Sequence, residues 1–201
     1  MEKPFQLPGV HIYEYLLLLR IPGGLCRRIE EEREIIVREF GLKQPQPGRP
    51  NIPLAHFRMM KQSEEKMIQR LEKIAEGQKP FQVGLQDYRG YPMHALLVDV
   101  VNQQKILDLV KSIKPLRKWM QDGKEAPYFI SDPNIVLAGR LTNDQYIAIM
   151  NEYMRRKFRD QFLVESFLLL RKSKEEEIYT PVKEFGFQKK AAKKAQPVLF
   201  S

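Results

Sequence analysis

One short segment occurs twice in this chain, and no other feature of the sequence constrains the fold as strongly. Residues 50–55 read Pro-Asn-Ile-Pro-Leu-Ala and residues 133–138 read Pro-Asn-Ile-Val-Leu-Ala, so five of six positions match at an offset of 83 residues. This spacing is longer than the period of about 20 to 50 residues that is typical of solenoid repeats. The repeat therefore predicts two similar halves, with its two copies as strands that line a groove between them.

The remaining pattern mixes strands and helices without strict alternation. Apolar runs and alternating apolar residues predict strands at 11–20, 51–59, 81–85, 93–101, 134–141, 162–171 and 178–187. Helical spacing predicts helices at 25–40, after a cap at Ser63, at 103–120 with a break near Pro115, and at 143–157 after a Thr142/Gln145 capping box. Residues 88–92 are expected to form a turn and residues 121–131 a loop. Together these elements favour an α+β fold of bilobed, duplicated antiparallel-sheet halves, with helices on the outside and a central groove.

The length suits one large domain that buries a sizeable core. We expect residues 1–187 to form a single bilobed domain, with lobes at approximately 11–112 and 113–187. Its first ten residues are expected to be an extended arm. Residues 188–201 are basic and poor in core residues, which predicts a disordered tail.

The chain carries a net charge of +9, which suggests attraction to polyanions such as RNA, although a solvated basic surface explains it equally well. A single cysteine, Cys26, excludes an internal disulfide, and the scattered histidines lack metal-ligand spacing. The apolar run at 16–19 is far too short to cross a bilayer, and the first residues lack a signal-peptide pattern. We therefore expect a cytoplasmic monomer with no metal, no cofactor and no membrane association.

This arrangement resembles the 2H phosphoesterase superfamily, which includes bacterial RNA 2′,5′-ligase-like proteins and cyclic phosphodiesterases. The resemblance rests on the opening strand at 11–20, on the two repeated strands and on residues 164–170, which read Val-Glu-Ser-Phe-Leu-Leu-Leu. It continues into the strand at 179–187, which is similar to the C-terminal hairpin of the family. It spans roughly residues 11–187.

In the family each half supplies a His-x-Thr/Ser motif, which the resemblance places on the repeated strands. Two imidazoles then exchange protons with the attacking and leaving oxygens, and the hydroxyls hold the phosphate. Here Asn51 and Asn134 stand at the histidine positions, and Pro53 and Val136 stand at the hydroxyl positions. An asparagine amide forms hydrogen bonds but does not titrate near pH 7. The resemblance therefore implies the fold and the groove, but not the usual acid–base mechanism.

His56 is the candidate for a substitute catalytic group. Regular alternation would place it on the opposite strand face from Asn51, as a strand-end or partly packed histidine. A bulge between Pro53 and His56 would reverse that orientation.

Several other residues are candidates for binding a ligand. Arg140 shares strand parity with Asn134 and should face the groove if the strand stays regular. Guanidinium binds phosphate bidentately and would need no hydroxyl neighbours. The further candidates are side chains that could stack on a base, pair with phosphate or simply pack: Tyr13, Tyr15, Arg58 and Ser166.

Three functions follow from these observations. The first is a catalytically inactive protein that binds RNA ends, a nucleotide or another phosphate ligand in the groove. The second is an active 2′,3′-cyclic phosphodiesterase or RNA ligase that uses displaced residues such as His56. The third is a protein-interaction scaffold, which the apolar replacements Pro53 and Val136 would suit.

Overall fold

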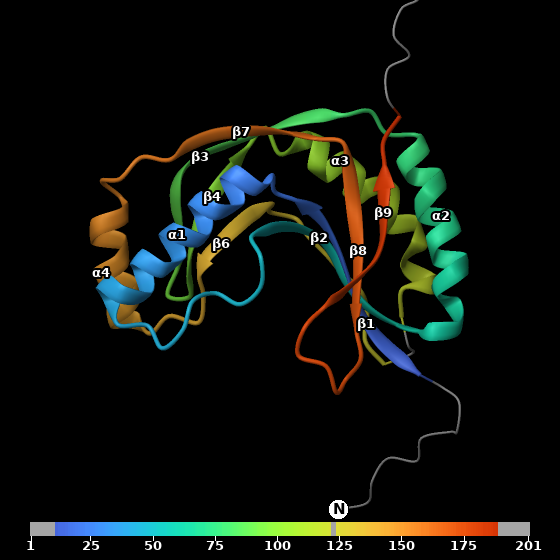
Figure 1. The fold of residues 1–201 in the computed structure, drawn as a ribbon, viewed down its shortest axis with the longest axis horizontal. Helices are drawn as coiled ribbons and strands as arrows, with labels where there is room; N and C mark the ends of the chain where they lie inside the picture. The colour runs from blue at the N-terminus through green and yellow to red at the C-terminus, as the bar shows by residue number, and fades with distance from the viewer. Residues whose placement is uncertain (1–10, 122–123, 189–201) are drawn as a thin grey trace, which may run out of the picture.

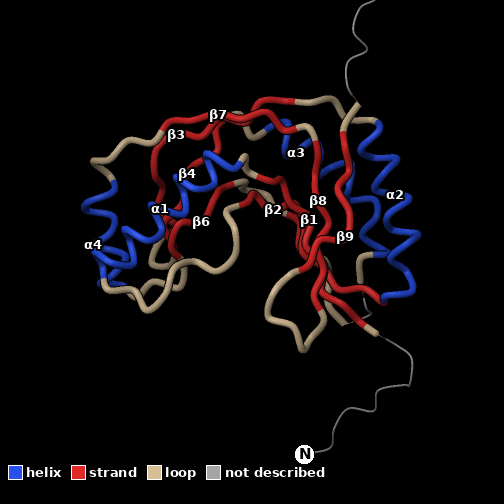
Figure 2. Tube along the Cα trace, viewed as in Figure 1, coloured by secondary structure: helices blue, strands red, loops and turns tan. Residues whose placement is uncertain are grey.

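The structure, a computed structural model, describes residues 11–121 and 124–188 (Figure 1). The predicted arm at 1–10 and nearly all of the predicted tail, 189–201, lie outside the described residues. Two antiparallel sheets and four α-helices make up the described chain, so the predicted α+β class is confirmed (Figures 1 and 2).

The first sheet, sheet A, has five strands in the order β5-β2-β1-β8-β9. Its strands are β1 (Ile12–Arg20), β2 (Asn51–Met60), β5 (Tyr128–Phe129), β8 (Ser166–Lys172) and β9 (Thr180–Gly186). Strand β1 lies at the centre, between β2 and β8. This position explains its continuous apolar run, because Leu17, Leu18 and Leu19 are buried although they alternate between the two faces.

The second sheet, sheet B, has four strands in the order β6-β4-β3-β7. Its strands are β3 (Phe81–Tyr91), β4 (Ala95–Val101), β6 (Asn134–Ala138) and β7 (Arg159–Val164). Strand β3 is longer than expected. The turn predicted at 88–92 is wrong, because Tyr88 remains in the strand, where its ring packs edge-on against Tyr153 and Phe158, and the chain turns only after Tyr91.

Each sheet packs its helices against one face. Helices α2 (Glu64–Glu76) and α3 (Gln104–Ile113) contact sheet A, whereas α1 (Gly23–Phe40) and α4 (Asn143–Tyr153) contact sheet B. Two short 3-10 segments, η1 (Lys61–Ser63) and η2 (Lys114–Trp119), precede α2 and follow α3, and η2 begins at the break predicted near Pro115.

One of the two expected helix caps is present and the other is not. The capping box of α4 is confirmed, because the Gln145 amide donates to the Thr142 hydroxyl and the Gln145 side chain accepts from the Thr142 amide. The Ser63 cap of α2 is wrong. Ser63 already has helical backbone angles at the end of η1, so its side chain makes no capping hydrogen bond.

The two sheets interleave along the chain. Each contains strands from both sides of residue 112, so the expected lobe boundary does not separate them. The predicted strand at 162–171 is divided between the sheets: β7 ends at Val164 in sheet B, β8 begins at Ser166 in sheet A, and only Glu165 lies between them. The continuous apolar pattern of residues 162–171 does not indicate this change of sheet, because both strands contain buried apolar residues.

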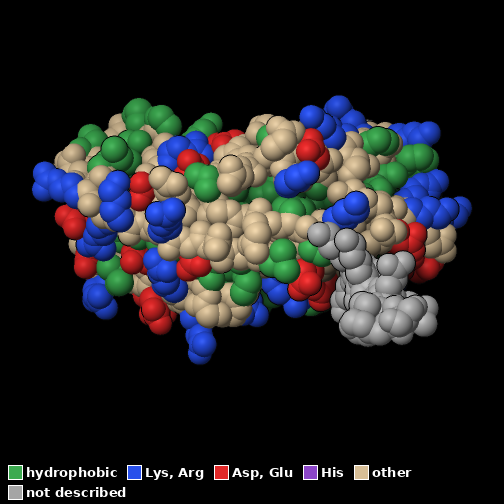
Figure 3. Space-filling model, turned by 90° about the horizontal axis from the view of Figure 1, so that it is seen from above, with side chains coloured by type: hydrophobic (Ala, Val, Ile, Leu, Met, Phe, Trp, Pro, Cys, Tyr) green, Lys and Arg blue, Asp and Glu red, His purple; other side chains and the backbone are tan. Residues whose placement is uncertain are grey.

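The surface shows no single basic patch in the view from above (Figure 3). Lys and Arg side chains lie at both ends of this face with acidic side chains among them, and the middle is mostly uncharged. No helix within 11–121 or 124–188 has the length and hydropathy needed to cross a membrane.

Candidate functional site

The two repeated strands share a local irregularity that decides where their side chains point. In β2, Ala55 pairs with Leu17 and Pro53 with Leu18, so Leu54 is an extra, bulged residue. In β6, Ala138 pairs with Leu96 and Val136 with Leu97, so Leu137 is bulged at the corresponding position. A bulge places two residues opposite one and reverses the alternation beyond it. The strands β2 and β6 contact each other, although they belong to different sheets.

We call the face of each sheet that carries the motif side chains its open face. In sheet A this face includes Asn51 and Pro53, which are half-buried, whereas Ile52 and Leu54 point into the core. In sheet B it includes Asn134 and Val136.

The bulge at Leu54 corrects the expectation for His56. Ala55 and Phe57 are buried and His56 is exposed, so His56 shares the open face with Asn51 and Pro53. The same reversal at Leu137 corrects the expectation for Arg140. Ala138 is buried, β6 ends there, and Arg140 has a left-handed backbone with φ of 56°. Arg140 is exposed and lines a separate cavity beyond the end of the strand.

Asn51 and Asn134 form the same local hydrogen bond. The Asn51 amide donates to the carbonyl of Arg49 at 2.9 Å, and the Asn134 amide donates to the carbonyl of Asp132 at 2.7 Å. In each case a proline lies between the two partners. The hydrogen bond therefore fixes the backbone conformation where the strand begins. Each amide keeps one N–H and its oxygen for other partners.

A polar cluster surrounds His56 on the open face of sheet A. We call Glu14, His56, Lys172 and Tyr179 the His56 cluster. The His56 Nε2 lies 3.1 Å from the Tyr179 hydroxyl, which donates to Glu14 at 3.4 Å, and the Lys172 ammonium lies 3.3 Å from Glu14. Burial, and then the charge and hydrogen bond of Glu14, raise the pKa of Tyr179 to about 12. The hydroxyl therefore stays protonated and connects the imidazole to a carboxylate.

Two further side chains border this cluster. Tyr128 of β5 pairs directly with His56 across the strands, and 60% of its surface is exposed. Arg58 lies on the same face, and its guanidinium is 3.2 Å from Glu125.

Sequence reasoning missed most of this cluster. Tyr128 lies in the segment predicted as a loop, where nothing in the sequence indicates a two-residue strand. Glu14 had a visible signal, because it is a charged residue inside an apolar strand. Tyr179 lies within the predicted closing strand, but no local pattern indicates its contact with His56.

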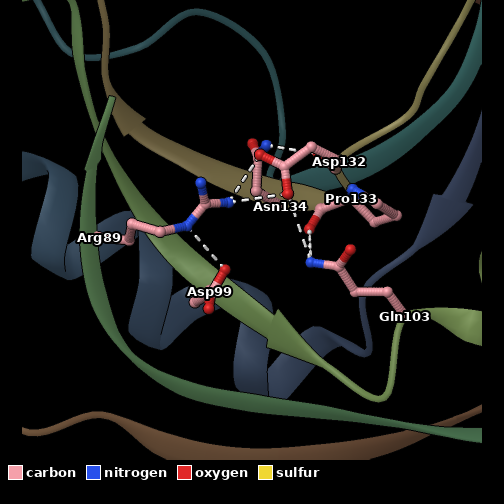
Figure 4. A network of polar contacts seen from close by, with 6 residues as sticks. All are labelled: Arg89, Asp99, Gln103, Asp132, Pro133 and Asn134. Carbon is pink, nitrogen blue, oxygen red and sulfur yellow. Dashed lines mark hydrogen bonds and ion pairs between the residues drawn. The ribbon is translucent and has the colours of Figure 1, made fainter. Parts of the chain in front are cut away.

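The open face of sheet B carries a closed ionic network (Figure 4). The Arg89 guanidinium bridges Asp99 at 2.9 Å and both carboxylate oxygens of Asp132 at 3.0 and 2.8 Å. Gln103 donates to Asp132 at 3.4 Å, and Asn134 holds the backbone carbonyl of the same aspartate. This network fixes the start of β6, and the guanidinium of Arg89 is neutralised by two carboxylates.

The candidate tyrosines of β1 lie on the other face of sheet A. Tyr15 is fully buried, stacks on Phe57 with ring centroids 5.3 Å apart, and donates to Glu64 at 2.9 Å. Tyr13 shares this face beneath the guanidinium of Arg171. Tyr15 therefore packs in the core, which is one of the roles that the sequence suggests for it besides stacking on a base.

Ser166 lies at the other end of the open face of sheet A. Its hydroxyl donates to Glu184 at 2.6 Å, and Arg20 lies 3.8 Å from the same carboxylate. These three residues line a cavity of about 360 Å³ at the start of α1. Within 11–121 and 124–188 no cluster of three or more His, Cys, Asp or Glu side chains could hold a metal ion.

No protein-family model matches the sequence, and no curated protein matches it. Solved structures match in fold. Escherichia coli LigT with 3′-AMP has a TM-score of 0.61 at 13% identity, over 89% of this chain and 99% of that chain. TT0787 of Thermus thermophilus has a TM-score of 0.63 at 17% identity, over 89% of this chain and 100% of that chain. A protein described as a phosphoesterase has a TM-score of 0.63 at 15% identity, over 88% and 99%. These proteins have the 2H phosphoesterase fold, so the fold that the motif resemblance implied is confirmed.

Proposed function

We propose that this chain, which has the 2H phosphoesterase fold, binds the phosphate-bearing end of an RNA or a nucleotide on the open face of sheet A without cleaving it. The LigT structures with 3′-AMP, ATP and phosphate support this class of ligand, because they are complexes of a protein of the same fold.

The motif positions support binding over turnover. Asn51 and Asn134 do not exchange protons near neutral pH, and Pro53 and Val136 offer no hydroxyl. Loss of a general acid or base typically costs about 10²–10⁴ in rate, and both are replaced here. The bulge brings one imidazole, His56, back to the open face. The position of the second repeat that corresponds to His56 is Gly139, directly after the end of β6, so a second imidazole is missing from the matching place.

The observation that carries the proposal is the exposed ring of Tyr128 beside His56. Sequence-tolerant binding of single-stranded RNA uses aromatic rings on which bases stack, together with cations that follow the phosphates. Tyr128 supplies an exposed ring, and His56, Lys172 and Arg58 supply the polar groups around it. Because Glu14 and Glu125 neutralise these cations, stacking should contribute more to affinity than charge does.

Fluorescence anisotropy with a labelled single-stranded RNA that ends in a 3′-phosphate tests this function. We expect saturable binding, weakened about fivefold to a hundredfold by Tyr128→Ala, which removes one stacking ring. A smaller loss is expected for His56→Ala. The matched control is Tyr91→Ala, because Tyr91 is similarly exposed but lies in sheet B. Absence of saturable binding, or equal affinity of the Tyr128 and Tyr91 variants, would reject the proposal.

One observation favours a second function, hydrolysis of a 2′,3′-cyclic phosphate. The chain from Glu14 through Tyr179 to His56 orients the imidazole, and no described residue pairs with its Nδ1. Incubation with 2′,3′-cyclic nucleotides, followed by chromatography, distinguishes the two. Turnover that disappears in His56→Ala would establish the enzyme and replace the binding function.

A further inference from the structure

A second cavity lies beyond the C-terminal end of β6, away from the His56 cluster. It encloses about 580 Å³ between the loop at 42–47, residues 136–142 and the first turn of α4, with Arg33 and Val37 of α1 along one side. This volume falls within the range of about 300–1,000 Å³ that is typical of small-molecule sites.

The side chains that line this cavity carry a net positive charge. Arg33, Lys43 and Arg140 line it, and none of the described residues that line it is Asp or Glu. No ion pair or side-chain hydrogen bond of Lys43 or Arg140 occurs with any residue in 11–121 or 124–188. The cations of the His56 cluster differ in this respect, because Lys172 is paired with Glu14.

Arg33 adds a fixed positive charge. Its side chain is buried and donates to the carbonyls of Val136 at 2.7 Å and of Gly48 at 2.7 Å. Its partners are therefore neutral groups. Burial lowers the pKa of Arg33, and a guanidinium remains charged in proteins. Arg33 also donates to the carbonyl of Gln46 at 3.4 Å, so its hydrogen bonds connect the loop at 42–47 and Gly48 to the edge strand β6.

Gly139 lines the cavity without a side chain of its own. Gly139 follows the bulged Leu137 by two residues, as His56 follows the bulged Leu54. A Cβ atom there would lie 3.1 Å from the side-chain oxygen of Gln46, across the cavity. The left-handed backbone of Arg140, unfavourable for a residue other than glycine, turns the chain so that Arg140 lines the space beside it.

We infer that this cavity binds a small phosphorylated molecule of about nucleotide size, with Arg140 and Lys43 on the phosphate. Guanidinium forms bidentate hydrogen bonds with phosphate, and an ammonium adds a mobile charge. The amide and hydroxyl groups of Gln44, Gln46 and Thr142 line the remaining wall and suit a polar body. This inference goes beyond the proposed function, because it concerns a different surface and different residues.

Isothermal titration calorimetry with three probes tests the inference: 5′-AMP, adenosine and inorganic phosphate. We expect 5′-AMP to bind more tightly than phosphate, and adenosine not to bind in the cavity. Arg140→Ala should raise the Kd of 5′-AMP in this site about tenfold or more, and Lys43→Ala about threefold to tenfold. Lys105→Ala is the matched control, since Lys105 is an exposed lysine on α3 that does not line the cavity.

Two further variants separate this site from the one on sheet A. Gly139→Leu should fill the cavity and abolish 5′-AMP binding there, because its nearest obstacle is the flexible end of Gln46. His56→Ala should leave that binding unchanged, whereas it weakens RNA binding in the proposed function. The inference is overturned if wild type does not bind 5′-AMP, if phosphate binds as tightly as 5′-AMP, or if the Arg140 and Lys105 variants behave alike.

Discussion

The Nε2 atom of His56 lies 3.1 Å from the hydroxyl oxygen of Tyr179, although 123 residues separate the two in sequence. The hydroxyl also donates to Glu14, so its oxygen is free to accept the Nε2–H of His56. This arrangement favours the tautomer of His56 that carries its proton on Nε2. It leaves Nδ1 available to accept a hydrogen bond from another group.

Tyr179→Phe should remove this connection while keeping the ring over which Lys172 lies. We expect a loss of about 0.5–1.5 kcal/mol in the free energy of unfolding, because one part-buried hydrogen-bonding group disappears. Urea denaturation measures it. Tyr128→Phe is the control, since no described residue bonds to its hydroxyl, and an equal loss in both variants would contradict the structural role of Tyr179.

Asn134→Ala should destabilise the protein by about 1–2 kcal/mol, and Asn51→Ala by about 0.5–1 kcal/mol, in urea denaturation. Both variants lose the bond to the carbonyl two residues earlier, but Asn134 also supports the Asp132–Arg89 network. Asn143→Ala, in the exposed first turn of α4, should change stability by less than about 0.5 kcal/mol. A larger effect at Asn51 than at Asn134 would show that the network does not depend on the asparagine.

Arg33→Lys should cost about 2–4 kcal/mol, although it keeps the charge. A single ammonium cannot reach the carbonyls of Val136 and Gly48 as the guanidinium fork does, and unsatisfied buried carbonyls are costly. Amide hydrogen exchange should accelerate at Gln46 and Gly48. The exposed Arg38→Lys substitution on the same helix serves as the control, and unchanged exchange in Arg33→Lys would disprove the anchoring role.

Glu64→Gln should destabilise the protein in a pH-dependent manner. Burial opposes the charged form of Glu64, but the bonds from Lys61, Arg171 and Tyr15 outweigh it and lower its pKa. A lowered folded-state pKa stabilises the protein fully above the unfolded value of about 4.3, and that contribution is lost as the pH falls through the folded value. We expect a cost of about 2–4 kcal/mol at pH 7 that shrinks steadily below about pH 4.

Urea denaturation of both proteins from pH 7 to pH 2.5 measures this difference. Glu65→Gln provides the comparison, because Glu65 is the exposed neighbour on the same helix. A difference between wild type and Glu64→Gln that stays constant across this range would show that the charge of Glu64 does not contribute.

Local sequence patterns predict the helices and strands more accurately than they predict which strands pair with each other. The repeated strands, the hairpin of β3 and β4 and the capping box of α4 follow from local patterns, and all are present. The α+β class followed from the same patterns. The internal duplication stays a prediction, although the corresponding bulges at Leu54 and Leu137 agree with it.

The orientation of His56 and Arg140 could not be read from the sequence. It depends on bulges at Leu54 and Leu137, and a bulge is set by how a strand pairs with its neighbour rather than by its own residues. The strand that contains Tyr128 could not be predicted for a related reason. Its two residues form a strand only because they pair with the edge of β2. Long-range pairing therefore determined most of the candidate site.

The single residue between β7 and β8 has a consequence for how this protein is made. The last three strands complete both sheets, because β7 pairs with β3, and β8 pairs with β1 near the N-terminus. A chain still on the ribosome therefore exposes the unpaired sides of β1 and β3 until residues 159–186 emerge. Such contacts between distant segments form slowly, and open strand edges invite aggregation. We expect both sheets to be completed only after residues 159–186 have been synthesised, with a need for chaperone protection until then.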